Sequence, residues 1–267
     1  MIDYRIIQQL KDYDESRMTY PCAAQIKMDG IFGRFCPSAD RSFYTRSGNK
    51  IIGLTRLITQ LDDIAFSLDG ELVIPGLDFF TMNGLIRSFN ETPACKYYVF
   101  DKPEPVSSYL TRASLYKKLL PTEFYSPLVV PMKVHIINNQ VEADKFYKLA
   151  LSKEFEGVVY KQLQATYKDG KHWENMKRVP WKTTECTITG YYEGKGKLRG
   201  MLGGFVVDFN GRDVKVGGGP GMDYTKRTKL WQTRDECIGQ PLKCRYKKLT
   251  KFGSMRSPQM LGIRWDI

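Results

Sequence analysis

The pattern of apolar segments changes near Lys182, and this change most constrains the fold. Before it, strand-like segments alternate with longer helix-like ones, which is typical of a mixed α+β domain. After it come five short strand-like segments with glycine-rich or basic loops and one helix-like stretch: 187–192, 203–209, 213–216, 240–247, 260–265 and the stretch 222–232. We therefore predict two domains, residues 1–182 and residues 183–267, without internal repeats.

The second region is also the more basic one. Residues 183–267 hold 16 basic and 8 acidic side chains, against 25 and 21 in residues 1–182, so this region carries 8 of the 12 net positive charges. Five short strands with a single helix predict a small, partly open barrel of the OB type, a frequent nucleic-acid platform. The charge favours a nucleic-acid partner over a membrane, because no basic amphipathic helix is evident. Solubility alone is the alternative explanation.

In the first region, residues 1–20 are expected to form an amphipathic helix that ends before Pro21, since proline disfavours helical geometry in the preceding residue. The segment 76–87 is expected to turn toward the next strand. The remaining periodicity predicts helices at 53–64, 107–120 and 140–153, and strands at 24–28, 33–37, 42–45, 66–74, 96–100 and 128–136.

Several classes of protein are disfavoured. No apolar run approaches the roughly 20 residues that span a bilayer, and the first residues are too polar for a secretory signal. The six cysteines are scattered without a C-x-x-C pair, and two histidines are too few to complete typical zinc sites, so free thiols are expected. We expect a cytosolic or nuclear protein that does not bind membranes.

The segment Gln25-Ile26-Lys27-Met28-Asp29-Gly30 places a lysine at the end of an apolar, strand-like run, with a carboxylate two residues on. A lysine amine is a poor nucleophile at neutral pH because its ordinary pKa is about 10.4. Desolvation or nearby cations would have to favour the neutral form. Lys27 is therefore a candidate nucleophile, with a surface lysine as the alternative.

Five downstream segments each carry one polar residue beside an apolar run, as expected if several strands deliver side chains into one pocket: Thr45-Arg46-Ser47-Gly48, Asp69-Gly70-Glu71-Leu72, Tyr97-Tyr98-Val99-Phe100-Asp101, Glu156-Gly157-Val158-Val159 and Lys177. This set suits adenylate transfer to lysine. Lys161 and Lys177 are cations for a phosphate, Glu156 is a hard oxygen donor for magnesium, and Phe100 and Glu71 suit a purine and its ribose. Taken singly, each also suits a surface or core position.

The order of these segments resembles that of the covalent nucleotidyltransferases, and among them the ATP-dependent DNA ligases. Gly194-Lys195-Gly196-Lys197, Gly200-Met201-Leu202-Gly203-Gly204 and Arg264-Trp265-Asp266 extend the resemblance into the second region. It is nearest to minimal phage, viral and bacterial ligases. The resemblance implies an α+β adenylation domain with antiparallel sheets and flanking helices, followed by an OB-fold barrel. It also implies a cytoplasmic location, or the host cytoplasm or nucleoid for a phage or viral chain.

The resemblance further implies an enzyme that seals 3′-OH/5′-phosphate nicks through lysyl-AMP on Lys27 and a DNA-adenylate. Asp29 and Lys177 would be catalytic, and Glu156 and Glu71 would hold Mg²⁺, with Mn²⁺ a possible substitute. Arg46 would contact the 5′ phosphate or the nucleotide phosphates, and Arg264 the leaving pyrophosphate. The full ATP-binding set would be Gln25, Ile26, Arg46, Glu71, Phe100, Lys161, Lys182 and Arg264. The DNA-binding set would be Arg34, Lys195, Lys197, Arg199, Lys247, Lys248 and Lys251.

Three positions depart from the family pattern. Phe32 stands where the family has arginine, Val179 replaces the second lysine of K-x-K, and Ile267 follows the R-x-D element in place of lysine. Nicked double-stranded DNA and ATP are the expected partners of a monomer. An RNA ligase or a capping-type nucleotidyltransferase is one alternative, and a non-catalytic, basic duplex-binding protein is another.

Overall fold

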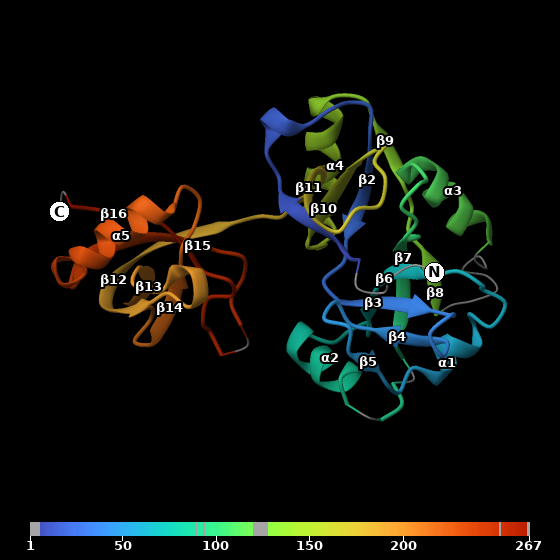
Figure 1. Cartoon of the computed structure of the whole chain (residues 1–267), viewed down its shortest axis with the longest axis horizontal. Coiled ribbons are helices and arrows are strands. Elements are labelled where there is room, and N and C mark those ends of the chain that lie inside the picture. The colour runs from blue at the N-terminus through green and yellow to red at the C-terminus, as the bar shows by residue number, and fades with distance from the viewer. Residues whose placement is uncertain (1–5, 89, 93, 120–127, 251, 266–267) are drawn as a thin grey trace. The chain divides into compact units, whose positions relative to one another are not determined.

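The computed structural model describes residues 6–88, 90–92, 94–119, 128–250 and 252–265 (Figure 1). The chain divides into two compact units, residues 1–179 and residues 180–267. The second unit therefore takes in the last three residues, 180–182, that the sequence pattern assigned to the first domain, and its first strand, β12, begins at Lys182. Among the described residues, no helix combines the length and the apolar character needed to cross a membrane.

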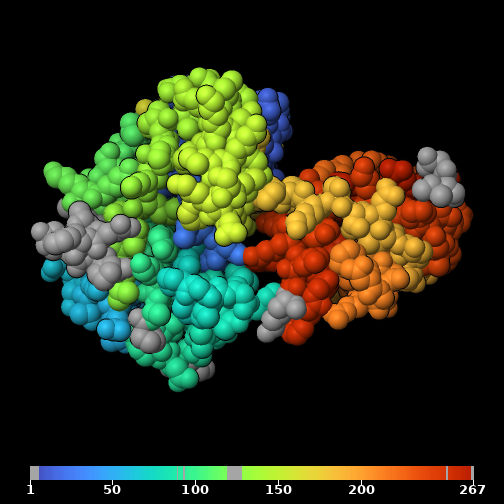
Figure 2. Space-filling view, turned by 180° about the vertical axis from the view of Figure 1, so that it is seen from behind, coloured from blue at the N-terminus to red at the C-terminus, as the bar shows by residue number. Residues whose placement is uncertain are grey.

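The first unit contains a five-stranded sheet in the order β1 (Gln8–Asp12), β11 (Gly170–Arg178), β10 (Gly157–Gln162), β2 (Cys22–Lys27) and β9 (His135–Ile137). All pairs are antiparallel except β1 with β11. Helix α4 (Gln140–Ser152) is capped by the Asn139 side chain and packs against β10, where the Tyr160 hydroxyl donates to the Ala143 carbonyl at 2.8 Å. From behind, α4 forms part of the outer surface over this sheet (Figure 2).

The same unit contains a six-stranded sheet in the order β5 (Lys50–Ile51), β4 (Ser42–Tyr44), β3 (Ile31–Cys36), β6 (Leu68–Val73), β7 (Lys96–Asp101) and β8 (Val129–Pro131). Helices α1 (Thr55–Thr59), α2 (Phe79–Ile86) and α3 (Tyr109–Leu119) accompany it (Figure 1). Its core includes the fully buried Phe35, Phe43, Leu72 and Tyr97. Burial of this apolar surface is the main source of stability.

The second unit is a five-stranded barrel in the order β12 (Lys182–Glu193), β13 (Leu202–Asp208), β14 (Asp213–Gly217), β16 (Gln259–Ile263) and β15 (Pro241–Tyr246). It also carries helix α5 (Tyr224–Gln232) and two short 3₁₀ turns, η2 (Gly196–Leu198) and η3 (Asp235–Cys237). The expected five strands and helix are present. The barrel is closed rather than partly open, because Gly217 of β14 pairs in parallel with Gln259 of β16.

Three local predictions were wrong. Residues 8–12 form strand β1 instead of a helix, and within residues 6–20 the only helical turn is η1 (Glu15–Arg17); residues 1–5 lie outside the described chain. The segment 76–87 contains helix α2, whose first turn is capped by Asp78. The segment 128–136 contributes to two strands of different sheets, β8 and β9. The β1 and β8–β9 errors have one cause, because backbone pairing with distant strands overrides local preference.

Candidate active site

Strand register places the candidate nucleophile on one face of the five-stranded sheet. Lys27 lies opposite Gly157, and Gln25 lies opposite Val159, which in turn lies opposite Lys177. Directly paired residues in a sheet share a face. Lys27, Gln25 and Lys177 therefore project to the same side, although they come from two distant parts of the sequence.

The Lys27 amine is paired with a carboxylate. Its Nζ lies 2.6 Å from Oε2 of Glu156, and the two side chains are only 20% and 18% exposed. Gly157 makes this approach possible, because its φ is +156° and a Cβ there would lie 2.1 Å from the carbonyl oxygen of Arg178. Only a residue without a side chain lets β10 follow this path and deliver Glu156 beside Lys27.

Glu71 of β6 approaches the same amine from the six-stranded sheet. The turn after Lys27 packs closely on β6, since a Cβ on Gly30 would lie 2.6 Å from the Glu71 Cγ. Burial raises the pKa of Glu71 to about 7; Lys27 and Arg46 oppose this rise, while the negative charge of Glu156 adds to it. The carboxylates of Glu71 and Glu156 thus interact electrostatically near one amine, between the two sheets.

These two carboxylates fit a divalent cation. Magnesium takes oxygen ligands and commonly uses only one or two protein carboxylates, with water and phosphate oxygens completing its coordination. The raised pKa of Glu71, caused by burial and partly by Glu156, indicates a place where additional positive charge is stabilised. Across the described part of the chain, no group of three or more histidine, cysteine, aspartate or glutamate side chains is arranged to hold a metal.

Two aromatic rings line the site next to Glu71. The ring centroids of Phe32 and Phe100 lie 6.3 Å apart with planes at 48°. Cations flank this pair, because the Arg46 Cζ lies 5.2 Å from the Phe32 centroid and the Lys161 Nζ lies 5.2 Å from that of Phe100. Phe100 is half-buried rather than part of the core, which suits a stacking face for a purine.

The family models decide the affiliation. The model of the "ATP dependent DNA ligase domain" matches residues 6–179, and that of the "DNA ligase OB-like domain" matches residues 193–264. The chain belongs to the ATP-dependent DNA ligase family. The predicted enzyme class and the α+β fold with an OB domain are therefore confirmed, and the alternative of a non-catalytic duplex-binding protein is not supported.

Individual relatives agree with this affiliation. A DNA ligase of Haemophilus influenzae is 23% identical over 238 residues, which cover 86% of this chain and 82% of that protein. A DNA ligase of Methanosphaera stadtmanae is 27% identical over 195 residues, covering 63% of this chain and 34% of that one. Among solved structures, a Lig E DNA ligase has a TM-score of 0.79 at 20% identity, covering 99% and 100% of the two chains. The bacteriophage T7 ligase in complex with ATP has a TM-score of 0.59 at 21% identity, covering 98% and 99%. At these identities the structures support the fold alone.

Three other predicted site residues lie close to Lys27 in the sequence but have different surroundings: Gln25 and Ile26, predicted to bind ATP, and Asp29, predicted to be catalytic. Gln25 is buried, and its Nε2 donates to the Tyr116 hydroxyl at 3.2 Å. Asp29 is half-buried in the turn after β2. The Ile26 side chain packs in the apolar cluster that contains Ala143 and Ala150 of α4, so it is directed away from the face of Lys27. The contact of Ile26 with ATP stays a prediction, and the packing of its side chain leaves the backbone as the part that can make it.

Lys161 does not present its charge to a phosphate. Its side chain is 4% exposed and its Nζ donates to Oδ2 of Asp101 at 2.8 Å, while Arg112 donates to the same carboxylate at 2.8 and 3.2 Å. The ammonium lies next to the rings of Phe100 and Tyr109. The predicted direct contact with ATP is contradicted, because both cations satisfy a buried Asp101. The sequence pattern gave no signal for Arg112.

Arg34 is also buried, which contradicts its predicted contact with DNA. Its side chain is 1% exposed, and its Nε and Nη2 donate to Oδ1 and Oδ2 of Asp69 at 2.6 and 2.9 Å. The Tyr167 hydroxyl accepts a bond from Arg34 at 2.6 Å and donates to Asp69. The arginine therefore belongs to a buried ion pair that joins β3 and β6.

Three further cations stay predictions, Lys177 as a catalytic residue and Arg264 and Lys182 as ATP ligands. The Lys177 Nζ lies 3.5 Å from Oδ1 of Asp12 and the side chain is 22% exposed. The Arg264 Nε lies 2.9 Å from Oε1 of Glu185 at the barrel surface. Lys182 is the exposed first residue of β12.

The predicted DNA-binding lysines and arginine of the barrel are accessible where the structure describes them. Lys195, Lys197 and Arg199 are exposed on and around η2. Lys247 and Lys248 are half-buried at the start of a hairpin in which the Lys247 N–H donates to the Arg256 carbonyl. Lys251 lies outside the described residues. Their contacts with DNA stay predictions.

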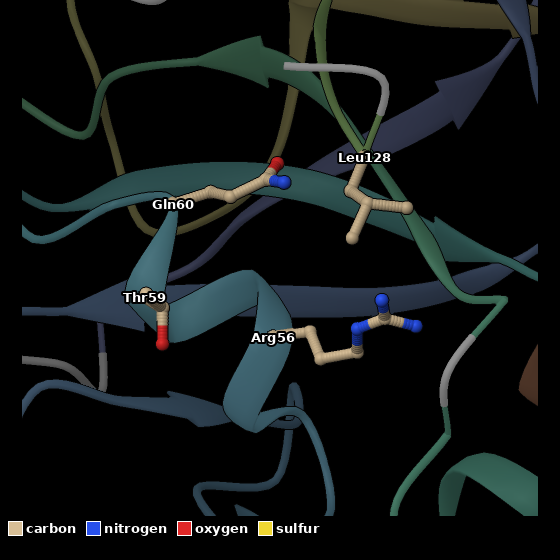
Figure 3. Close-up of a pocket in the computed structure, with 4 residues that line it drawn as sticks. All are labelled: Arg56, Thr59, Gln60 and Leu128. Atoms are coloured by element: carbon tan, nitrogen blue, oxygen red, sulfur yellow. The ribbon is translucent and has the colours of Figure 1, made fainter.

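A separate pocket lies beside helix α1. Arg56, Thr59 and Gln60 line it together with Leu128 (Figure 3). None of these residues belongs to the predicted site, so the pocket adds no group to the chemistry around Lys27.

Proposed function

We propose that this ligase seals nicks in duplex DNA through AMP bound covalently to Lys27. The supporting observation is the Lys27 amine, which lies 2.6 Å from Glu156, near Glu71, with the Phe32–Phe100 ring pair beside Glu71. In this proposal residues 1–182 transfer adenylate, residues 183–267 hold the DNA, and the chain acts as a monomer on ATP and nicked double-stranded DNA.

In the first transfer, the Lys27 nitrogen forms a bond to the α-phosphorus of ATP while the bond from that phosphorus to pyrophosphate breaks. An ammonium has no lone pair, so Lys27 must lose a proton and leave its ion pair before it attacks. Glu156 already accepts the hydrogen bond from this amine and is placed to take the proton. Lys177, on the same face as Lys27, supplies a cation for the phosphates. Such transfers depend mainly on alignment and charge stabilisation.

Glu71 and Glu156 would hold Mg²⁺, or Mn²⁺ as a substitute. When bound, the cation supplies charge neutralisation at the phosphate oxygens. Phe100 offers its half-buried ring to the adenine. Both sheets contribute to these assignments, because Lys27 lies on β2 and Glu156 directly precedes β10 of the five-stranded sheet, while Glu71 and Phe100 lie on strands of the six-stranded sheet.

The two later transfers act on DNA. AMP passes from Lys27 to the 5′ phosphate of the nick, and the 3′ hydroxyl then attacks that phosphate and expels AMP. Arg46 is exposed and suited to a phosphate of the nucleotide or of the DNA 5′ end. The basic side chains of the barrel would contact backbone phosphates without reading sequence.

The first test uses labelled ATP and Mg²⁺ without DNA. The wild-type chain should acquire one adenylyl group on Lys27, located by mass spectrometry, and release it to nicked duplex added afterwards. Lys27→Ala and Lys27→Arg should acquire none, while Lys153→Ala, at an exposed lysine after α4, should label normally. A Lys27→Ala protein that still becomes labelled would refute the proposal.

An RNA ligase or a capping-type enzyme would share the lysine chemistry. The match of residues 193–264 to a DNA ligase OB-like domain favours DNA as the substrate. Incubation with ATP or GTP, followed by nicked DNA or RNA ends, separates these functions. Preference for GTP, or sealing of RNA ends without sealing of nicked DNA, would overturn the assignment.

A further inference from the structure

Phe32 lies at the centre of the site although its side chain has no ionisable or hydrogen-bonding group. It lies on β3 directly opposite Glu71 of β6, and it is 8% exposed. Its ring contacts Phe100 at 6.3 Å and the guanidinium of Arg46 at 5.2 Å. One aromatic ring thus connects the carboxylate strand, the second ring and an arginine.

Arg46 reaches this ring from an ordered turn. The turn joins β4 to β5 and is closed by hydrogen bonds from the Thr45 N–H to the Asn49 carbonyl at 2.8 Å and from the Gly48 N–H to the Thr45 carbonyl at 3.0 Å. Arg46 itself is exposed, and its guanidinium places a positive charge beside the Phe32 ring. The backbone is fixed, whereas the long side chain has many rotamers in solution.

We propose that Phe32 is a positioning residue that holds the Arg46 guanidinium over its ring, ready to bind a phosphate oxyanion. A guanidinium stacked on an aromatic face keeps its N–H groups directed outward in its own plane, where they can bind two phosphate oxygens at once. The phosphate belongs either to ATP or to the DNA 5′ end. This inference rests on the proposed function and assigns a role to the position at which the chain lacks the family arginine.

The test separates the aromatic face from mere bulk. Phe32→Leu keeps an apolar side chain but removes the cation–π interaction, and Phe32→Trp restores an aromatic face. From the usual strength of such interactions, Phe32→Leu should slow the Arg46-dependent step about 3- to 30-fold. Phe32→Trp should recover most of that rate. Pentafluorophenylalanine at position 32 preserves the ring but reverses the sign of its electrostatic potential, so it should slow the Arg46-dependent step as Phe32→Leu does. Because it keeps the shape of the ring, it provides the same test if the leucine variant folds poorly.

Two assays identify which phosphate Arg46 binds. Labelling of Lys27 by ATP without DNA reports on the nucleotide phosphates, and transfer of AMP from preformed lysyl-AMP to a 5′-phosphorylated nick reports on the DNA end. In either assay, Phe32→Leu should have no further effect in an Arg46→Ala background. Wild-type rates for Phe32→Leu in both assays, or rate losses that multiply in the double variant, would overturn the inference.

Phe66→Leu is the matched control. Phe66 is half-buried, whereas Phe32 is buried, but it likewise has a cation beside its ring, since the Lys102 Nζ lies 5.4 Å from the centroid, and it is not among the site residues. It should leave both rates unchanged. Lys27→Ala separates the failure of the proposed function from the failure of this inference. If Lys27→Ala still becomes labelled, the proposed function fails. If Lys27→Ala is not labelled and Phe32→Leu reacts at the wild-type rates, only the role of Phe32 is rejected.

Discussion

Oε2 of Glu156 lies 2.6 Å from Nζ of Lys27, although 129 positions separate the two residues in the sequence. Antiparallel pairing of β10 with β2 brings them together, with Gly157 directly opposite Lys27. The pair combines the candidate nucleophile with the carboxylate that accepts a hydrogen bond from its amine, so a change at Glu156 should alter the reactivity of Lys27.

Glu156→Gln should slow formation of lysyl-AMP by about 100-fold, because it removes a charge that acts on the amine and on the reacting phosphates. The change in stability should be small, since the pair is partly exposed. Single-turnover labelling with ATP measures the rate, and thermal unfolding measures the fold. Glu236→Gln, at an exposed glutamate of the barrel, is the control. Near-wild-type labelling of Glu156→Gln would contradict this assignment.

Glu71 should make stability depend on pH. Burial raises its pKa to about 7 in the folded protein, while an unfolded glutamate titrates near 4.3. The folded state therefore binds the proton more tightly, so its stabilising contribution is complete below about pH 4 and is lost as the pH rises through 7. Glu71→Gln should remove this loss.

At pH 8 without metal, Glu71→Gln should accordingly unfold at a higher temperature than the wild type, by about 2–4 °C for each kcal/mol of the lost contribution, with little difference at pH 4. Thermal unfolding across this range measures the effect. Since a carboxylate must be deprotonated to bind a metal, Mg²⁺ should also stabilise the wild type more at pH 8 than at pH 5. Parallel curves for the two proteins would show that Glu71 does not titrate in this range.

Arg34 should contribute to stability and not to DNA binding. Arg34→Met leaves Asp69 buried without its cation, which typically costs about 3–5 kcal/mol. Lys50→Met, at the exposed Lys50–Asp40 pair, should cost less than about 1 kcal/mol. Urea unfolding compares the two. If folded Arg34→Met binds duplex DNA with a weaker salt dependence than the wild type, Arg34 contacts DNA after all, against what its burial indicates.

The residues around η2 should control the salt dependence of DNA binding. Replacing Lys195, Lys197 and Arg199 together by alanine should reduce the slope of log affinity against log salt by about 0.9 for each DNA phosphate that is no longer neutralised, hence by about 2.7 for three. Lys226→Ala with Lys229→Ala, at exposed positions of α5, is the control and should leave the slope nearly unchanged. Equal reductions in both variants would indicate that only net charge matters.

The sequence by itself determined the family, the two-part organisation and the segments that carry chemistry. Lys27 stands at the end of a strand, as its apolar run predicts, and five strands with one helix follow Lys182. These features depend on local periodicity and on the order of short motifs, which a sequence records directly. The positions of Glu71 and Phe100 on strands could be predicted for the same reason.

Only the tertiary structure decided which charges are available. Arg34 and Lys161 look like free cations in the sequence, yet both are buried on aspartates, Asp69 and Asp101, that come from other strands. Residues 8–12 likewise form a strand because their backbone pairs in parallel with β11, more than 150 positions later. The residue type does not show whether a charged side chain faces water or a buried carboxylate, because its partner is determined by the packing of distant segments.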